Sequence, residues 1–179
     1  MDASGLHLFD TPIGRCGIGW STGGIASVQL PDRDDARLLG RLRQRLPGAP
    51  LALPPAAVRE AADRTLRLLQ GMHDDLRDVV LDLHGIAPFH RQVYARARAI
   101  PPGRTITYGE LAADIGEPGA ARAVGQALGL NPFAPIVPCH RILAAASRSG
   151  GFSAPGGVHT KLRMLLIERA AFGAPGLFD

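Results

Sequence analysis

The chain has 179 residues, of which 46% are hydrophobic, so it is long enough for one ordinary domain or two small ones with a buried core. It contains no run of eighteen apolar residues and no signal-peptide pattern, which excludes a membrane-spanning helix and predicts a soluble, cytoplasmic protein without a membrane partner. The two cysteines, Cys16 and Cys139, lack the spacing of a disulfide framework or a zinc site, so we expect neither.

The positive charge lies in the second half of the chain. Residues 1–84 carry 10 basic and 11 acidic side chains, a net charge of −1, whereas residues 85–179 carry 10 and 5, a net charge of +5. A basic half favours a polyanionic partner, because contacts with phosphates release counterions. An arginine-rich solvated surface explains the charge equally well, so charge alone does not identify the partner.

The first 84 residues predict a small unit of strands and helices. Apolar and small side chains from Gly14 to Leu30 surround a turn at 21–24, which predicts a β-hairpin. Helical spacing of apolar residues predicts amphipathic helices over 34–46 and 55–70, and the proline-rich PGAPLALPP between them predicts a loop. After Asp78, the run VVLDLHG predicts another strand.

From Pro88 onward, helical spacing dominates and predicts helices over 89–100, 107–115 and 120–130. Thr107 and Glu110 fit a capping box at the start of the second of these helices, and a GEPG turn separates it from the third. This pair of helices resembles a helix-turn-helix. Many helical hairpins bind no nucleic acid, so the shape supports DNA binding only together with the basic charge of this half.

The segment NPFAPIVPCHRIL, residues 131–143, contains the candidate nucleophile. Its three prolines exclude an ordinary helix, and its apolar residues predict a buried, extended backbone around Cys139. A buried cysteine is most often inert, but the adjacent His140 and Arg141 are groups that favour a reactive thiolate. Because neighbours on a strand face opposite sides, we expect a bridging water between His140 and the sulfur. Glu168 is the best carboxylate to orient the imidazole, although a solvent-facing Glu168 fits the sequence equally well.

Residues from Gly85 to about Ala170 resemble the O6-alkylguanine-DNA alkyltransferases, also called methylated-DNA–protein-cysteine methyltransferases. The matching motifs occur in uninterrupted order: IPPGRTITYGELA, GAARAVGQALGLNP, IVPCHRIL, GGFSAPGG and the pair Lys161 and Glu168. The resemblance implies an α+β fold. It places a small ribonuclease-H-like α/β supporting unit in residues 1–84 and a winged helix-turn-helix catalytic domain in residues 85–179.

The resemblance also implies the activity: Cys139 accepts an alkyl group from O6 of guanine in double-stranded DNA, once and irreversibly, without a cofactor. His140 relays a proton through water, Glu168 orients His140, and Asn131 and Lys161 complete the catalytic set. The implied partner is DNA bound through its minor groove by a monomer. Activity on O4-alkylthymine, the preference for methyl over bulky groups, and cooperative binding are left open.

Six further residues are implied to contact substrate or DNA: Tyr108, Arg122, Val137, Arg141, Phe152 and Ser153. Arg122 matches an arginine that fills the space of a flipped-out base, and Tyr108 matches a tyrosine that donates toward guanine N3. The carbonyl groups of Val137 and Cys139 are implied to bind the guanine amino group.

Three residues depart from the family pattern. Phe152 stands where tyrosine is usual, in a loop with two extra residues, which leaves the role of Ser153 open. His90 and Tyr94 replace a glutamine and a tryptophan. We expect these two replacements to alter packing or flanking DNA contacts rather than the chemical step.

Two alternative functions are considered. An alkyltransferase-like protein would recognise alkylated bases without transfer, but such proteins characteristically lack the cysteine that stands here at 139. A cysteine hydrolase would use Cys139 and His140 on a small molecule, which leaves Tyr108, Arg122 and Asn131 without a joint explanation.

Overall fold

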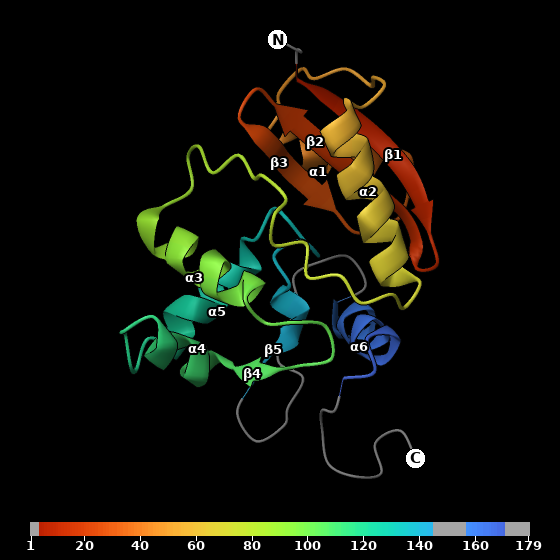
Figure 1. Ribbon diagram of the computed structural model, residues 1–179. Helices are drawn as coiled ribbons and strands as arrows, with labels where there is room; N and C mark the ends of the chain where they lie inside the picture. The colour runs from red at the N-terminus through yellow and green to blue at the C-terminus, as the bar shows by residue number, and fades with distance from the viewer. Residues whose placement is uncertain (1–3, 145–156, 171–179) are drawn as a thin grey trace.

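The computed structural model describes residues 4–144 and 157–170, which form a mixed α/β fold (Figure 1). Strands β1 (Gly5–Thr11), β2 (Gly14–Ser21) and β3 (Gly24–Gln29) form an antiparallel sheet in the order β1-β2-β3. Helices α1 (Asp35–Arg43) and α2 (Ala56–Leu69) cover opposite faces of this sheet. The predicted hairpin and both predicted helices of the first half are therefore confirmed, and β1 is an additional strand.

Small residues in β2 let α1 approach the sheet closely. A Cβ atom on Gly17 would lie 2.6 Å from a methyl carbon of Leu42, which is fully buried in α1. The opposite face of β2 carries Ile18 and Trp20, which pack in a separate cluster with Val58 and other residues of α2. Strand β2 thus presents glycines to α1 and bulky apolar side chains to α2, and the sheet separates two hydrophobic clusters.

The strand predicted after Asp78 is not formed. Leu81 makes only an isolated bridge to Ile25 at the free edge of β3, through the hydrogen bonds Ile25 N–H to Val80 O (3.0 Å) and Asp82 N–H to Ile25 O (2.7 Å). Pairing does not continue because the next carbonyl groups are used elsewhere. The Arg45 guanidinium donates to the carbonyl oxygens of Asp82 and His84.

The second half contains four described helices: α3 (Pro88–Arg98), α4 (Tyr108–Asp114), α5 (Ala121–Gly129) and α6 (Gly157–Ile167). The short strands β4 (Ile106–Thr107) and β5 (Ile142–Leu143) pair in parallel. The capping box is confirmed, because Thr107 Oγ1 accepts from Glu110 N–H and the Glu110 carboxylate accepts from Thr107 N–H. No helix within residues 4–144 and 157–170 is long and apolar enough to cross a membrane.

The free edge of β3 joins the first half to the segment before Cys139. Val28 N–H donates to Pro132 O (2.8 Å), and Val28 bridges Phe133. Arg45 reinforces this junction, because its Nε donates to Ala26 O (2.6 Å) and its guanidinium carbon lies 5.5 Å from the centroid of the Phe133 ring. One arginine therefore connects the sheet, the linker at 82–84 and the segment that precedes Cys139.

Replacing Arg45 by methionine is expected to lower the free energy of unfolding by about 2 kcal/mol, because three backbone carbonyl groups lose a charged donor while the apolar stem remains. Urea denaturation followed by circular dichroism measures this change. Arg43→Met is the matched control: Arg43 is exposed and makes one long bond, 3.4 Å, to Ala49 O. Equal destabilisation by both variants would contradict a special role for Arg45.

Candidate active site

Cys139 begins a short 3-10 turn, Cys139–Arg141, rather than continuing the extended backbone that was predicted. Arg141 N–H donates to Pro138 O (3.0 Å) and Cys139 N–H donates to Val137 O (2.9 Å), so the chain turns at the cysteine. The segment is buried as expected, and Cys139 is a free thiol with 7% of its surface exposed. Because the backbone is a turn and not a strand, the side chains of Cys139 and His140 need not point to opposite sides, as had been expected.

Asn131 fastens the start of this segment to its end. Its Nδ2 donates to Val137 O (2.9 Å), and its Oδ1 accepts from Phe133 N–H (2.9 Å). Burial raises the pKa of the Cys139 thiol, and the neighbouring Asn131 amide and the charge of Lys161 only partly offset this effect. The resting group is therefore a protonated thiol that needs a base to become a nucleophile.

A carboxylate shared by two side chains lies next to this turn. His140 Nε2 lies 2.8 Å from Glu168 Oε1, and Arg141 binds both Glu168 oxygens, with Nε at 2.9 Å from Oε2 and Nη2 at 2.7 Å from Oε1. All three residues are buried. Burial raises the pKa of Glu168, but the combined charge and hydrogen bonds of His140 and Arg141 outweigh it and bring the pKa to about 2.

His140 is neutral and has one ring nitrogen available. Burial lowers the pKa of the imidazole, against the opposing effect of Glu168. Because the ionised Glu168 accepts a hydrogen from Nε2, the tautomer that fits leaves Nδ1 as an unprotonated acceptor. Nδ1 is buried and has no hydrogen-bond partner among residues 4–144 and 157–170. An unpaired acceptor on the residue next to Cys139 is the feature that a general base requires.

Arg141 does not have the position that was expected of a substrate or DNA contact. Only 1% of its surface is exposed, and besides Glu168 its Nη1 donates to Ile100 O (2.7 Å). The guanidinium is enclosed because Glu168 and the end of α3 surround it. Its contacts are those of a residue that holds Glu168 in place.

Lys161 and Tyr108 approach the cysteine from α6 and α4. Lys161 Nζ donates to Ile142 O (2.8 Å) and lies 5.8 Å from the centroid of the Tyr108 ring. Burial lowers the pKa of Lys161 to about 8, and the Cys139 charge acts in the opposite direction. Burial and the Cys139 charge both raise the pKa of Tyr108. Both side chains therefore respond electrostatically to a thiolate at Cys139.

The remaining predicted site residues have fewer contacts with Cys139, His140, Glu168 and Lys161. Arg122 is an exposed residue of the first turn of α5, and its side chain forms no hydrogen bond or ion pair with the described residues. The Val137 carbonyl already accepts from Asn131 and from Cys139 N–H, which uses both lone pairs and argues against the predicted contact with a guanine amino group. The Cys139 carbonyl accepts from Ile142 N–H and from no other group in the described part of the chain. Phe152 and Ser153 lie outside the described residues.

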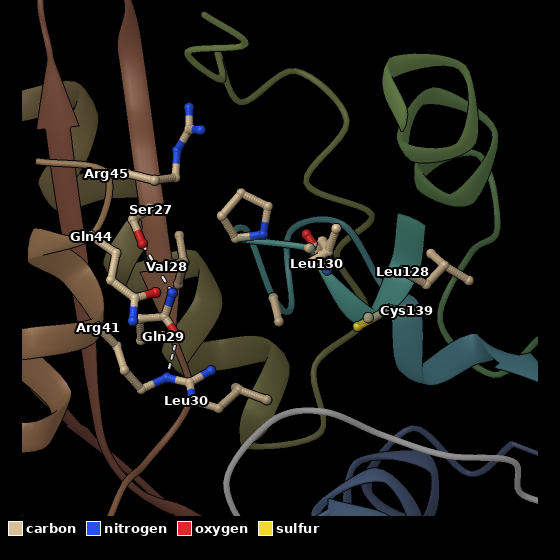
Figure 2. A pocket seen from close by; sticks show the side chains of 14 residues that line it. Ser27, Val28, Gln29, Leu30, Arg41, Gln44, Arg45, Leu128, Leu130 and Cys139 are labelled. Atoms are coloured by element: carbon tan, nitrogen blue, oxygen red, sulfur yellow. Dashed lines mark hydrogen bonds between the residues drawn. The ribbon is translucent and has the colours of Figure 1, made fainter. Parts of the chain in front are cut away.

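A cavity of about 260 Å³ extends from Cys139 to the first half of the chain (Figure 2). Its lining includes Ser27 and Gln29 of β3 and Arg41 of α1, none of which was predicted as a site residue. No local motif marks these residues, since they meet Cys139 only through the packing of the two halves. The described residues include no group of three or more His, Cys, Asp or Glu side chains that could hold a metal ion.

Comparison with known proteins agrees with this geometry. Residues 88–170 match the family model described as 6-O-methylguanine DNA methyltransferase, DNA binding domain. A methylated-DNA–protein-cysteine methyltransferase of Mycolicibacterium paratuberculosis is 48% identical over 92 residues, which cover 51% of this chain. The match covers 54% of that relative, so this chain spans about half the length of the curated relative.

Solved structures extend the likeness to both halves of the chain. The O6-methylguanine methyltransferase of Mycobacterium tuberculosis is 33% identical with a TM-score of 0.75, and the alignment covers 98% of this chain and 99% of that one. Mycobacterium tuberculosis OGT in complex with DNA is 34% identical with a TM-score of 0.72, covering 92% of each chain. The chain therefore belongs to the family of O6-methylguanine-DNA methyltransferases, which are also called methylated-DNA–protein-cysteine methyltransferases.

Proposed function

We propose that this protein repairs double-stranded DNA by moving an alkyl group from O6 of guanine to its own Cys139. The observation that carries the proposal is Nδ1 of the buried, neutral His140, which has no hydrogen-bond partner among the residues that the structure describes. Glu168 holds the ring through Nε2, and the preceding residue is the buried thiol of Cys139. A thiol whose pKa is raised by burial needs such a base.

In the proposed reaction, a water between His140 Nδ1 and Cys139 Sγ carries the thiol proton to the imidazole. The thiolate then displaces guanine at the alkyl carbon, so that a C–S bond forms as the C–O6 bond breaks, and the departing base takes a proton. Glu168 stabilises the transient imidazolium, and Arg141 holds Glu168. A thioether offers no leaving group for hydrolysis, so each molecule acts once.

The substrate contacts proposed around this centre follow the family pattern with one change. Tyr108 donates toward guanine N3 as negative charge develops on the base, and Lys161 stabilises the thiolate. Asn131 couples the end of α5 to the acceptor segment. The Cys139 carbonyl, rather than that of Val137, receives the guanine amino group. Phe152 and Ser153 are proposed to border the base.

The proposed DNA-binding element is the α4–turn–α5 pair, with α5 in the minor groove and Arg122 replacing the flipped-out base. The exposure of Arg122 and the open space around Gly125 support close approach of a DNA backbone. We further propose that residues 85–179 form a winged helix-turn-helix catalytic domain and residues 1–84 a ribonuclease-H-like supporting domain. Action as a monomer and a cytoplasmic location remain predictions.

Mixing the protein with a duplex that contains one O6-methylguanine is expected to add about 14 Da to Cys139, stopping at one equivalent. Intact-mass spectrometry with peptide mapping measures the adduct. Cys139→Ser is expected to bind the same duplex without gaining mass, because a hydroxyl does not replace a thiolate. Binding by the unaltered protein without an adduct would instead support recognition without transfer, and turnover beyond one equivalent would support a hydrolase.

Glu168→Gln is expected to lower the free energy of unfolding at pH 7 by about 3 kcal/mol, because the buried Arg141 loses its ionised partner. The pKa of Glu168 is lowered to about 2 from 4.5, so its stabilising effect is complete above pH 4.5 and is lost as the pH falls toward 2. The difference between the two proteins should narrow by about 1.4 kcal/mol per pH unit below 4.5. Denaturation curves at pH 7, 5, 4 and 3 test this, and a difference that stays constant to pH 3 would contradict it.

Arg122→Ala is expected to slow transfer from a duplex at least tenfold while leaving reaction with free O6-benzylguanine within about twofold, because only the duplex requires base extrusion. Single-turnover rates on both substrates measure the effect. Arg33→Ala removes another exposed positive charge, from the first half of the chain, and controls for general electrostatic attraction. An equal loss on both substrates would show instead that Arg122 supports the acceptor site.

A further inference from the structure

The cavity beside Cys139 has two chemically different walls. Near the cysteine, the lining is mostly apolar: Leu128 and Ala134, which pack in the same hydrophobic cluster as Cys139, together with Gly129, Leu130, Pro132 and the amide-bearing Asn131. The opposite wall comes from β3, the end of α1 and the residues that follow each of them, and it carries the polar side chains of Ser27, Gln29, Arg41, Gln44 and Arg45 beside Val28 and Leu30 (Figure 2). A group attached to the sulfur and extending across the cavity would therefore pass from apolar to polar surroundings.

The charge of the polar wall is positive. Two arginines and no carboxylate occur among the fourteen residues that line the cavity. Arg45 is committed to the carbonyl oxygens of Ala26, Asp82 and His84. The charge that remains available is therefore that of Arg41.

Arg41 has unused hydrogen-bond donors. Its Nε donates to Gln29 Oε1 (3.0 Å), and its other N–H groups bond to no acceptor in the described part of the chain. The nearest carboxylate is that of Asp32, which does not line the cavity. Its Oδ2 lies 4.0 Å from Arg41 Nε, and its Oδ1 lies 3.6 Å from Arg37 Nε. The Arg41 side chain is 37% exposed, so it retains mobility and access to solvent. A guanidinium with free parallel donors is suited to binding a carboxylate.

The cavity is larger than a methyl group requires. Its volume of about 260 Å³ greatly exceeds the roughly 30 Å³ that one water molecule takes up in the liquid. We propose that the cavity receives the substituent during its transfer to Cys139, and that Arg41 favours O6-alkyl groups that end in a carboxylate. This inference rests on the proposed alkyl transfer and adds the class of alkyl group that the site prefers.

The reaction step does not change for such a substrate. The thiolate attacks the carbon bonded to O6, a C–S bond forms, the C–O6 bond breaks, and guanine leaves with the electron pair and takes up a proton. The distal carboxylate keeps its charge and takes no part in bond breaking. Arg41 therefore acts as a specificity residue, by pairing with the part of the substituent that is remote from the reacting carbon.

The test compares two duplexes that differ only in charge at the end of the substituent. One contains O6-(3-carboxypropyl)guanine and the other contains the neutral O6-(3-carbamoylpropyl)guanine of nearly the same size. We expect the unaltered protein to react about fivefold faster with the carboxylate, a factor typical of a partly exposed ion pair. Arg41→Gln should bring the ratio of the two single-turnover rates to about one.

Two further variants separate the role of Arg41 from folding and from general charge. Arg41→Lys keeps the charge and should retain a preference for the carboxylate. Arg43→Gln removes a neighbouring charge that neither lines the cavity nor pairs with Asp32, and should leave the ratio unchanged. A ratio of one or less in the unaltered protein, or a ratio that Arg41→Gln does not reduce, would overturn the inference.

An O6-methylguanine duplex distinguishes failure of this inference from failure of the proposed function. Normal methyl transfer without a carboxylate preference would refute only the role of Arg41. Absence of transfer from O6-methylguanine as well as from both larger substituents would refute the proposed function itself, and with it the inference.

Discussion

The shared carboxylate of Glu168 is the interaction on which the site depends. A buried carboxylate is costly unless it is paired, and here three hydrogen bonds from His140 and Arg141 keep it ionised. The ionised carboxylate in turn selects the tautomer of His140 in which Nδ1 is an unprotonated acceptor, and this atom has no partner within residues 4–144 and 157–170. The same contacts join the end of α6 to the turn at Cys139, so the arrangement that orients the base also holds two elements of the fold together.

The first half of the chain supports the segment that leads to Cys139, whereas Glu168 at the end of α6 holds the residues that follow Cys139. The edge of β3 binds the segment after α5 through Val28 and Pro132, and Arg45 lies over Phe133. Asn131 then links the same segment to Val137, two residues before Cys139. Two of these links are hydrogen bonds and one is a cation–π contact, and all of them hold a segment whose prolines prevent it from forming regular structure of its own. A segment without a regular hydrogen-bond ladder needs such external partners to keep one conformation.

The electrostatics of the site combine burial with a few directed contacts. Burial alone would keep Cys139 as a thiol, Lys161 partly neutral and His140 neutral. The proposed reaction uses this state, because a neutral imidazole accepts the thiol proton and the lysine stabilises the thiolate once it forms. The cavity on the other side of Cys139 adds a second, more exposed cation in Arg41. The charges proposed to drive the reaction and the charge proposed to select the substituent thus come from different halves of the chain.

Sequence alone determined the elements that depend on local spacing. The hairpin, the helices, the Thr107 capping box and the identity of Cys139 within a proline-rich motif all follow from residues near one another, and motif order identified the family. The strand predicted after Asp78 is not formed, because Arg45, which is distant in sequence, takes the carbonyl groups of Asp82 and His84 beyond the single bridge at Leu81. The prediction of an extended backbone at Cys139 was also wrong: the residue begins a 3-10 turn, which the pattern of apolar residues does not specify.

Tertiary structure decided which distant residues meet. Glu168 is 28 positions from His140, and its burial could not be distinguished from exposure on a helix end until α6 was packed against the turn. The inward direction of Arg141 and the approach of Arg41 to the Cys139 cavity were equally unavailable from sequence. The physical reason is that helix and strand periods report which face of an element is buried, whereas the partner on that face is set by how separate elements pack.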